Sequence, residues 1–164
     1  MAGRSFRLGI TLVLLALAAC DPQRVEKLEE GVSTEVQVRQ QFGEPVTVTR
    51  NADGSQVFDY PRQPEGWTNY RIVIGADGRM SSLRQLLNED NFARVKPGMD
   101  QSQVRELLGR PASMKRYELK QEDVWNWRFK PMNESRQFSV SFGPDGRVLS
   151  SATGDDPREA LPSH

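Results

Sequence analysis

The stretch DQSQVRELLGRP, residues 100–111, decides the fold, because TEVQVRQQFGEP at residues 34–45 repeats its plan. Each stretch opens with Asp or Thr followed three positions later by Gln, a capping box that satisfies the free N–H groups at a helix start. Val104, Leu107 and Leu108 then form an i, i+3, i+4 apolar stripe. Gly43 and Gly109 then predict a left-handed residue that ends each helix, and the proline two positions later prevents the helix from resuming. Both stretches therefore predict a short amphipathic helix.

Three further blocks recur in the same order, so the chain carries two copies of one unit. They are residues 25–31 and 92–98, residues 57–60 and 124–127, and residues 70–79 and 138–147. Apolar and polar residues alternate in the last two blocks, which predicts antiparallel strands with one buried face, joined by Asp-Gly hairpin turns. The turn-forming residues Asn-Ala-Asp-Gly at 51–54 indicate an additional hairpin in the first copy. The sequence predicts an α+β tandem repeat, with two helices packed on a three- to four-stranded antiparallel sheet in each unit.

The first twenty residues have the pattern of a bacterial lipoprotein signal. Arg4 and Arg7 precede an apolar run that ends at Ala19, too short for the ~20 residues of a spanning helix. The run ends in Leu17-Ala18-Ala19-Cys20, which resembles a lipobox, where a peptidase cuts before a cysteine that carries acyl chains such as palmitate. Ordinary secretory cleavage after Ala18 also fits, but it would leave an unpaired thiol in an oxidising compartment. We therefore expect lipidation at Cys20.

Composition argues against nucleic-acid partners and against an enzyme. Without residues 1–19 the chain has 20 basic and 22 acidic side chains, a net charge of −2, whereas nucleic-acid binding requires a basic excess. The single histidine, His164, lies in a polar tail, and the single cysteine is assigned to lipid. No Ser/His/Asp set and no Cys/His metal-ligand spacing can form. We expect no cofactor, no metal and no catalytic residue.

A few residues are candidates for partner contact. Trp67 lies in a Pro- and Gly-containing loop, Gly98-Met99-Asp100 forms a turn before the second helix, and Arg128 lies on the polar face of a strand. The aromatic residues Trp125 and Trp127 alternate with polar neighbours and are expected in the core.

The sequence divides into five segments. They are a signal peptide (1–19), the lipidated cysteine with a short tether (20–24), a first unit (25–87), a second unit (88–153) and a disordered tail (154–164). A tether of four extended residues reaches roughly 15 Å. The first unit should therefore lie against the lipid headgroups, while the second faces the periplasm.

At these residues the chain resembles the BamE-type (SmpA/OmlA) lipoprotein family. The second copy carries the pattern in Gly98-Met99-Asp100, Leu107-Leu108-Gly109-Arg110-Pro111, Trp125-Asn126-Trp127 and Asp145-Gly146-Arg147, and the first copy is a degenerate version. Similar tandem units occur in secreted inhibitors of β-lactamase.

The resemblance implies a non-enzymatic accessory subunit of the machinery that inserts β-barrel proteins into the bacterial outer membrane. It also implies protein partners, nearby acidic phospholipid and a location on the periplasmic face of the outer membrane. Asp21 after Cys20 resembles an inner-membrane retention signal, so the inner membrane stays an alternative. The alternative function is a periplasmic binding module that binds an enzyme in the concavity between its two units and thereby inhibits or senses it.

Overall fold

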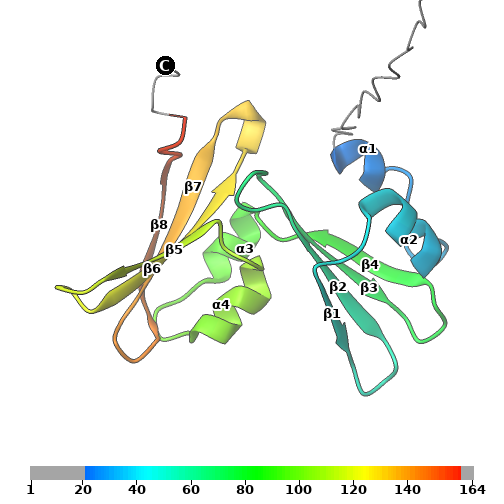
Figure 1. Ribbon diagram of the computed structural model, residues 1–164, viewed down its shortest axis with the longest axis horizontal. Helices are drawn as coiled ribbons and strands as arrows, with labels where there is room; N and C mark the ends of the chain where they lie inside the picture. The colour runs from blue at the N-terminus through cyan, green and yellow to red at the C-terminus, as the bar shows by residue number, and fades with distance from the viewer. Residues whose placement is uncertain (1–20, 160–164) are drawn as a thin grey trace, which may run out of the picture.

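The computed structural model describes residues 21–159 and contains two copies of one helix-and-sheet unit (Figure 1). The first unit comprises α1 (Asp21–Val25), α2 (Glu35–Phe42), β1 (Thr47–Arg50), β2 (Gln56–Pro61), β3 (Asn69–Ile74) and β4 (Met80–Gln85). The second comprises α3 (Glu89–Arg94), α4 (Gln101–Leu108), β5 (Ser113–Tyr117), β6 (Glu122–Phe129), the 3₁₀ turn η1 (Pro131–Asn133), β7 (Arg136–Phe142) and β8 (Val148–Asp155). Each set of four strands forms an antiparallel sheet in chain order. The predicted tandem α+β fold is confirmed.

The two units stack so that helices and sheets alternate across the molecule. In Figure 1 helices α3 and α4 lie between the two sheets, whereas α1 and α2 cover the outer side of the first sheet. Contacts between the units join β3 to the end of α4. Asn69 Nδ2 donates to the Leu108 carbonyl at 2.7 Å, and Arg71 Nη1 donates to the Glu106 carbonyl at 2.7 Å. The first sheet therefore has one face on its own helices and the other toward those of the second unit.

Each unit has its own apolar core between its helices and its sheet. In the first unit, Val38 and Phe42 of α2 pack on Phe58 and Ile72. In the second, the aromatic residues of β6 provide much of the volume, and Trp127 is fully buried. These aromatic residues were predicted as core, and that prediction is confirmed. No helix between residues 21 and 159 is long and apolar enough to cross a bilayer.

An aromatic side chain fixes the end of the second helix to the sheet in each unit. Tyr60 Oη donates to the Gly43 carbonyl at 3.1 Å, and Trp127 Nε1 donates to the Gly109 carbonyl at 3.1 Å. Burial raises the pKa of Tyr60 to about 12 against the opposing effect of nearby Arg39, so its hydroxyl stays a donor even at alkaline pH, where an exposed tyrosine ionises. The recurring helix, Gly-x-Pro and aromatic strand are therefore parts of one contact.

Both glycines adopt a backbone conformation that other residues avoid. Gly43 has φ 80° and ψ −164°, and Gly109 has φ 71° and ψ −159°. The sequence predicted a left-handed helix end. The observed ψ values instead place both residues in a region that is almost exclusive to glycine.

Both ends of the paired units differ from the predicted segment boundaries. The expected tether begins with helix α1 directly at Asp21, so the chain leaves Cys20 without an extended linker. At the other end β8 continues through Gly154 to Asp155, and Asp156 is 2% exposed. The expected disorder from residue 154 is therefore wrong for these residues, because Asp156 forms an internal ion pair with Arg128.

We predict that Gly109→Ala destabilises the protein more than Gly43→Ala does. Both substitutions force a side chain into the glycine-only region, which costs of order 1–3 kcal/mol. A methyl group on Gly43 meets nothing within 4 Å, but on Gly109 it meets Asn69 Nδ2 at 3.1 Å and Leu86 Cδ1 at 3.3 Å. Urea unfolding of the two variants measures the difference. Equal losses of unfolding free energy would show that the contact between the units carries no strain at Gly109.

Candidate functional site

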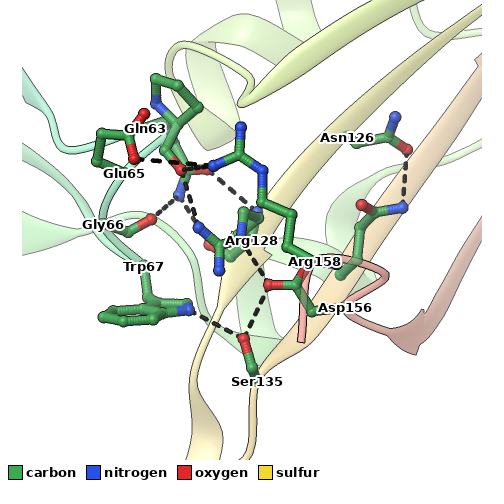
Figure 2. Close-up of polar contacts among 11 residues, drawn as sticks. Gln63, Glu65, Gly66, Trp67, Asn126, Arg128, Ser135, Asp156 and Arg158 are labelled. Carbon is green, nitrogen blue, oxygen red and sulfur yellow. Dashed lines mark hydrogen bonds and ion pairs between the residues drawn. The ribbon is translucent and has the colours of Figure 1, made fainter. Parts of the chain in front are cut away.

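The two units meet at a polar joint made by the β2–β3 loop, the end of β6 and the residues after β8. Gln63 from the loop is 6% exposed, and its side-chain amide pairs with the peptide group of Arg128 (Figure 2). Gln63 Nε2 donates to the Arg128 carbonyl at 2.7 Å, and Arg128 N–H donates to Gln63 Oε1 at 3.2 Å. The amide therefore pairs with β6 as the backbone of a neighbouring strand would.

The side chain of the same Arg128 forms a buried ion pair with Asp156. Arg128 Nε donates to Asp156 Oδ2 at 2.5 Å, and the two side chains are 8% and 0% exposed. Arg128 Nη1 also donates to the Pro64 carbonyl at 3.0 Å, and the Ser135 hydroxyl donates to Asp156 at 2.8 Å. Burial alone would raise the pKa of Asp156, but the hydrogen bonds from Arg128, the Arg158 N–H and Ser135 outweigh it, so the pKa is lowered. The guanidinium and the carboxylate are thus both charged and paired at neutral pH.

Trp67 packs against the second unit of the same chain. Its Nε1 donates to Ser135 Oγ at 3.0 Å (Figure 2). The Arg128 guanidinium lies 5.3 Å from the indole ring centre and Lys130 Nζ lies 4.7 Å from it, both cation–π contacts. The structure therefore brings the candidates Trp67 and Arg128 together. The expected partner contact at Arg128 is wrong, because the first unit covers its side chain.

The candidate turn Gly98-Met99-Asp100 lies elsewhere, between α3 and α4. Gly98 N–H donates to the Val148 carbonyl at 2.9 Å, and Val148 N–H donates to the Met99 carbonyl at 2.8 Å. Arg147 Nη1 donates to the Gly98 carbonyl at 2.8 Å. The turn is thereby clamped to the start of β8. Gly98 remains exposed and Met99 half-buried, so a partner contact there stays a prediction.

Asp100 ends this turn as the N-cap of α4. Its carboxylate accepts hydrogen bonds from the Ser102 hydroxyl at 2.6 Å and the Gln103 N–H at 2.9 Å, and these bonds lower the pKa of Asp100. The first unit repeats the clamp, since Arg79 Nη1 donates to the Val32 carbonyl at 2.8 Å. The Asp-Gly-Arg ending of each unit therefore has a structural task.

A groove of about 220 Å³ opens between the end of α4 and the face of the first sheet that is turned toward the second unit. Thr47, Asp59 and Arg71 line it from the sheet, and Arg105 and Arg110 line it from the second unit. Arg71 Nε pairs with Asp59 at 2.8 Å, and the Arg105 guanidinium lies 4.7 Å from the ring centre of Trp125. The groove is thus a concave surface between the units in which arginine side chains lie beside apolar residues such as Val46 and Leu86, of the kind that can receive a protein segment.

Sequence reasoning missed Gln63, Asn69 and Asp156 as joint residues. Asn69 gives only a weak signal, because it is a polar residue at the start of a mostly apolar strand; in the structure it is 1% exposed. Gln63 and Asp156 lie in segments that read as solvated loops, and their partners lie far away in the sequence.

The remaining predicted sites fall outside the described residues or concern metals. Cys20 and the lipobox residues Leu17, Ala18 and Ala19 lie outside residues 21–159, so the structure has no bearing on them. Among the described residues, no group of three or more His, Cys, Asp or Glu side chains could hold a metal ion.

Comparison with known proteins finds one family. Residues 85–152 match the family model described as the outer membrane protein assembly factor BamE domain. A search of curated proteins finds no significant match. The match covers most of the second unit and leaves the first outside it.

Solved structures resemble the chain at low identity. One is named as the osmotically inducible lipoprotein OsmE, with 25% identity and a TM-score of 0.39, covering 47% of this chain and 87% of that one. Another is a DUF4309 family protein, YjgB, from Bacillus subtilis, with 15% identity, a TM-score of 0.33, and coverage of 82% and 86%. A third, named as a β-lactamase inhibitor protein from Streptococcus mutans, has 13% identity, a TM-score of 0.34, and coverage of 82% and 95%.

We predict that Asp156→Asn destabilises the protein by about 3 kcal/mol at neutral pH, because it leaves the buried Arg128 without its charged partner. Asp155→Asn is the matched control. Its carboxylate is 88% exposed and pairs with Arg136 at the surface, so the loss should be no more than about 0.5 kcal/mol.

The pH dependence of the same variants tests the charge on Asp156. Because folding lowers the pKa of Asp156, its stabilisation is complete above the ordinary carboxyl pKa of 3.8 and is lost as the pH falls through the lower folded value. Urea unfolding from pH 7 to pH 2 should show that the wild-type advantage over Asp156→Asn is constant above about pH 4 and shrinks progressively as the pH falls below it. A difference that persists unchanged at pH 2 would contradict the ion pair.

Proposed function

Residues 85–152 belong to the BamE domain family, and on that premise we propose that the chain is a membrane-anchored binding subunit in the assembly of β-barrel proteins into the bacterial outer membrane. The family match is the observation that carries this proposal. The resemblance of the second unit in its Gly-Met-Asp, Leu-Leu-Gly-x-Pro and Asp-Gly-Arg residues supports it. Its partners would be other subunits of the assembly machinery, with acidic phospholipid nearby.

The proposed activity is binding without catalysis. The family motifs have structural tasks in this chain: they cap α4, clamp the turn before it and anchor its end to Trp127. At the joint, Arg128 pairs with Asp156 and Arg158 lies 3.8 Å from Glu65, so these charges are directed toward one another rather than into an open cavity. This arrangement suits a rigid body that presents surfaces to partners.

The proposed anchor would hold the first unit very close to the membrane. Helix α1 starts at Asp21, directly after Cys20, and five helical residues span only about 7 Å at 1.5 Å per residue. Arg24 and Lys27 follow on the same segment, although Glu26, Glu29 and Glu30 dilute their attraction for acidic headgroups. Acyl chains on Cys20 would therefore supply most of the membrane affinity.

The groove between the units keeps a second function open. A periplasmic binding module that inhibits or senses an enzyme would use a concave surface, and the groove beside Arg71, Arg105 and Arg110 is such a surface. Under this alternative, substitution of Arg110, which is exposed and lies at the groove, should abolish capture of an enzyme.

We predict that Cys20→Ser moves the protein from the membrane fraction to the soluble periplasmic fraction, because the acyl chains are lost. Separation of inner and outer membranes on a density gradient then decides whether Asp21 retains the wild-type protein in the inner membrane.

Purification of the wild-type protein from native membranes should recover the barrel-insertion subunit and its helical-repeat lipoprotein partner. Recovery of a cell-wall enzyme instead would favour the inhibitor or sensor function.

We also predict that the first unit lies nearer the bilayer than the second. Nitroxide labels on Val32→Cys and Ser150→Cys, both at exposed positions in the two units, report the distance by depth-dependent relaxation in vesicles. The label at position 32 should be relaxed more strongly by a lipid-bound agent. Equal relaxation at the two positions would overturn the proposed orientation.

A further inference from the structure

The last strands of the two units, β4 and β8, are structurally equivalent edge strands. Each begins with a residue whose backbone points away from its sheet: Met80 N–H donates to the Ser33 carbonyl at 2.7 Å, and Val148 N–H donates to the Met99 carbonyl at 2.8 Å. A register shift follows at the same place in both sheets. Counting onward from these matched points, Ser151 occupies the position of Leu83.

The outer edge of β4 is closed by the first unit itself. Leu83 N–H donates to Glu30 Oε1 at 2.8 Å, and Arg84 pairs with the same carboxylate. The Leu83 side chain packs with Val25 and Leu28 against the core. A carboxylate and the α1 segment therefore cover this edge.

The outer edge of β8 has no such cover. Pro97 stands at the position of Glu30, 67 residues later, so a capping carboxylate is missing there. Residues 149–155 are all exposed. Among the described residues, no hydrogen bond reaches the outer backbone groups of β8 beyond Val148. By its equivalence to Leu83, Ser151 directs its N–H outward, and alternate residues along an antiparallel strand do the same.

An open edge of this length is unusual because proteins generally guard such edges with charge, proline or short strands. The first edge strand, β1, has four residues and ends in Arg50, and β5 carries Lys115 and Arg116. In contrast, β8 has eight residues, and although it also ends in a charge, Asp155, the seven residues from Val148 to Gly154 carry no charge and no proline. Its sequence therefore leaves a backbone template open to an added strand.

We propose that the outer edge of β8, residues 149–155, receives an extended segment of a partner protein as a fifth strand of the second sheet. The inference rests on the proposed function as a binding subunit. An extended chain is the ligand whose N–H and C=O groups repeat at the spacing of the exposed edge. Because residues 148–154 carry no charge, they favour a partner segment whose central residues are also uncharged.

The side chains of β8 favour a different protein over a second copy of this chain. Ser150, Ser151, Ala152, Thr153 and Gly154 are small, so an incoming strand with large side chains has room on both faces. Antiparallel pairing of two copies about the centre of residues 149–155 would place Ala152 opposite its own copy and Ser151 opposite Thr153, small against small. Such pairs contribute little, because contacts between facing side chains stabilise a sheet. The expected partner segment is extended and carries large β-branched or aromatic residues.

Photocrosslinking in native membranes tests the proposal. The full chain carries p-benzoylphenylalanine at Ala152, and adducts are mapped by mass spectrometry. We expect one major adduct, at an extended segment of a partner protein. Ser151→Pro should reduce its yield at least tenfold, because it removes the outward N–H, and an edge strand tolerates proline where that N–H faces solvent. Ser151→Ala is the matched control and should keep the adduct, since it retains the N–H.

A second variant tests the same edge without the risk that a new proline misfolds the strand. Thr153→Lys adds an edge charge without altering the backbone and should give the same loss of adduct, with an unchanged thermal unfolding temperature. The proposal is overturned by the absence of an adduct, by adducts with lipid or a second copy alone, or by an adduct that survives both Ser151→Pro and Thr153→Lys. If those variants still co-purify with the assembly subunits, the edge proposal fails while the proposed function stands.

Discussion

The hydrogen bond from an aromatic donor to the carbonyl of a helix-ending glycine is the constraint on which each unit depends. Tyr60 makes it to Gly43 and Trp127 makes it to Gly109, at the same distance. The glycine must adopt its restricted backbone conformation so that the helix stops there, and the aromatic ring must be buried to reach it. Helix length, core packing and strand register are thereby set together, and this explains why the two copies keep the same architecture although their sequences have diverged.

A second, different kind of interaction holds the units to each other. The cores are separate, and the contacts between the units are largely polar: Gln63 pairs with the Arg128 backbone, Asn69 with the end of α4, and Asp156 with the Arg128 guanidinium beside Trp67. Polar contacts are directional, so this joint fixes the angle between the units more strictly than an apolar contact of similar size would. The groove and the open edge of β8 then keep a constant relation to the proposed membrane anchor.

The sequence was sufficient for the repeat and insufficient for the joint. Capping boxes, the Gly-x-Pro endings and alternating aromatic residues are local signals, and they placed α4, β6 and the core residue Trp127 correctly. The joint depends on pairs far apart in the sequence, such as Gln63 with Arg128, whose polar character is also that of ordinary loop residues. Arg128 was therefore predicted on the solvent-exposed face of its strand. The turn at Met99 was predicted as a partner contact, although its backbone is hydrogen-bonded to Val148. Which surface of one copy meets the other is a property of shape, and periodicity carries no information about it.

The place of Asp156 in the chain has a consequence for biogenesis. Under the proposed export the N-terminus crosses the membrane first, so the first unit can complete its sheet before the carboxylate that closes the interface has arrived. During that interval the surface awaiting the second unit is exposed, and its amides, unlike aliphatic side chains, are well hydrated and resist aggregation. The emerging protein can thus tolerate a half-built stage, and it becomes a single rigid body only after the residues beyond the final strand have arrived.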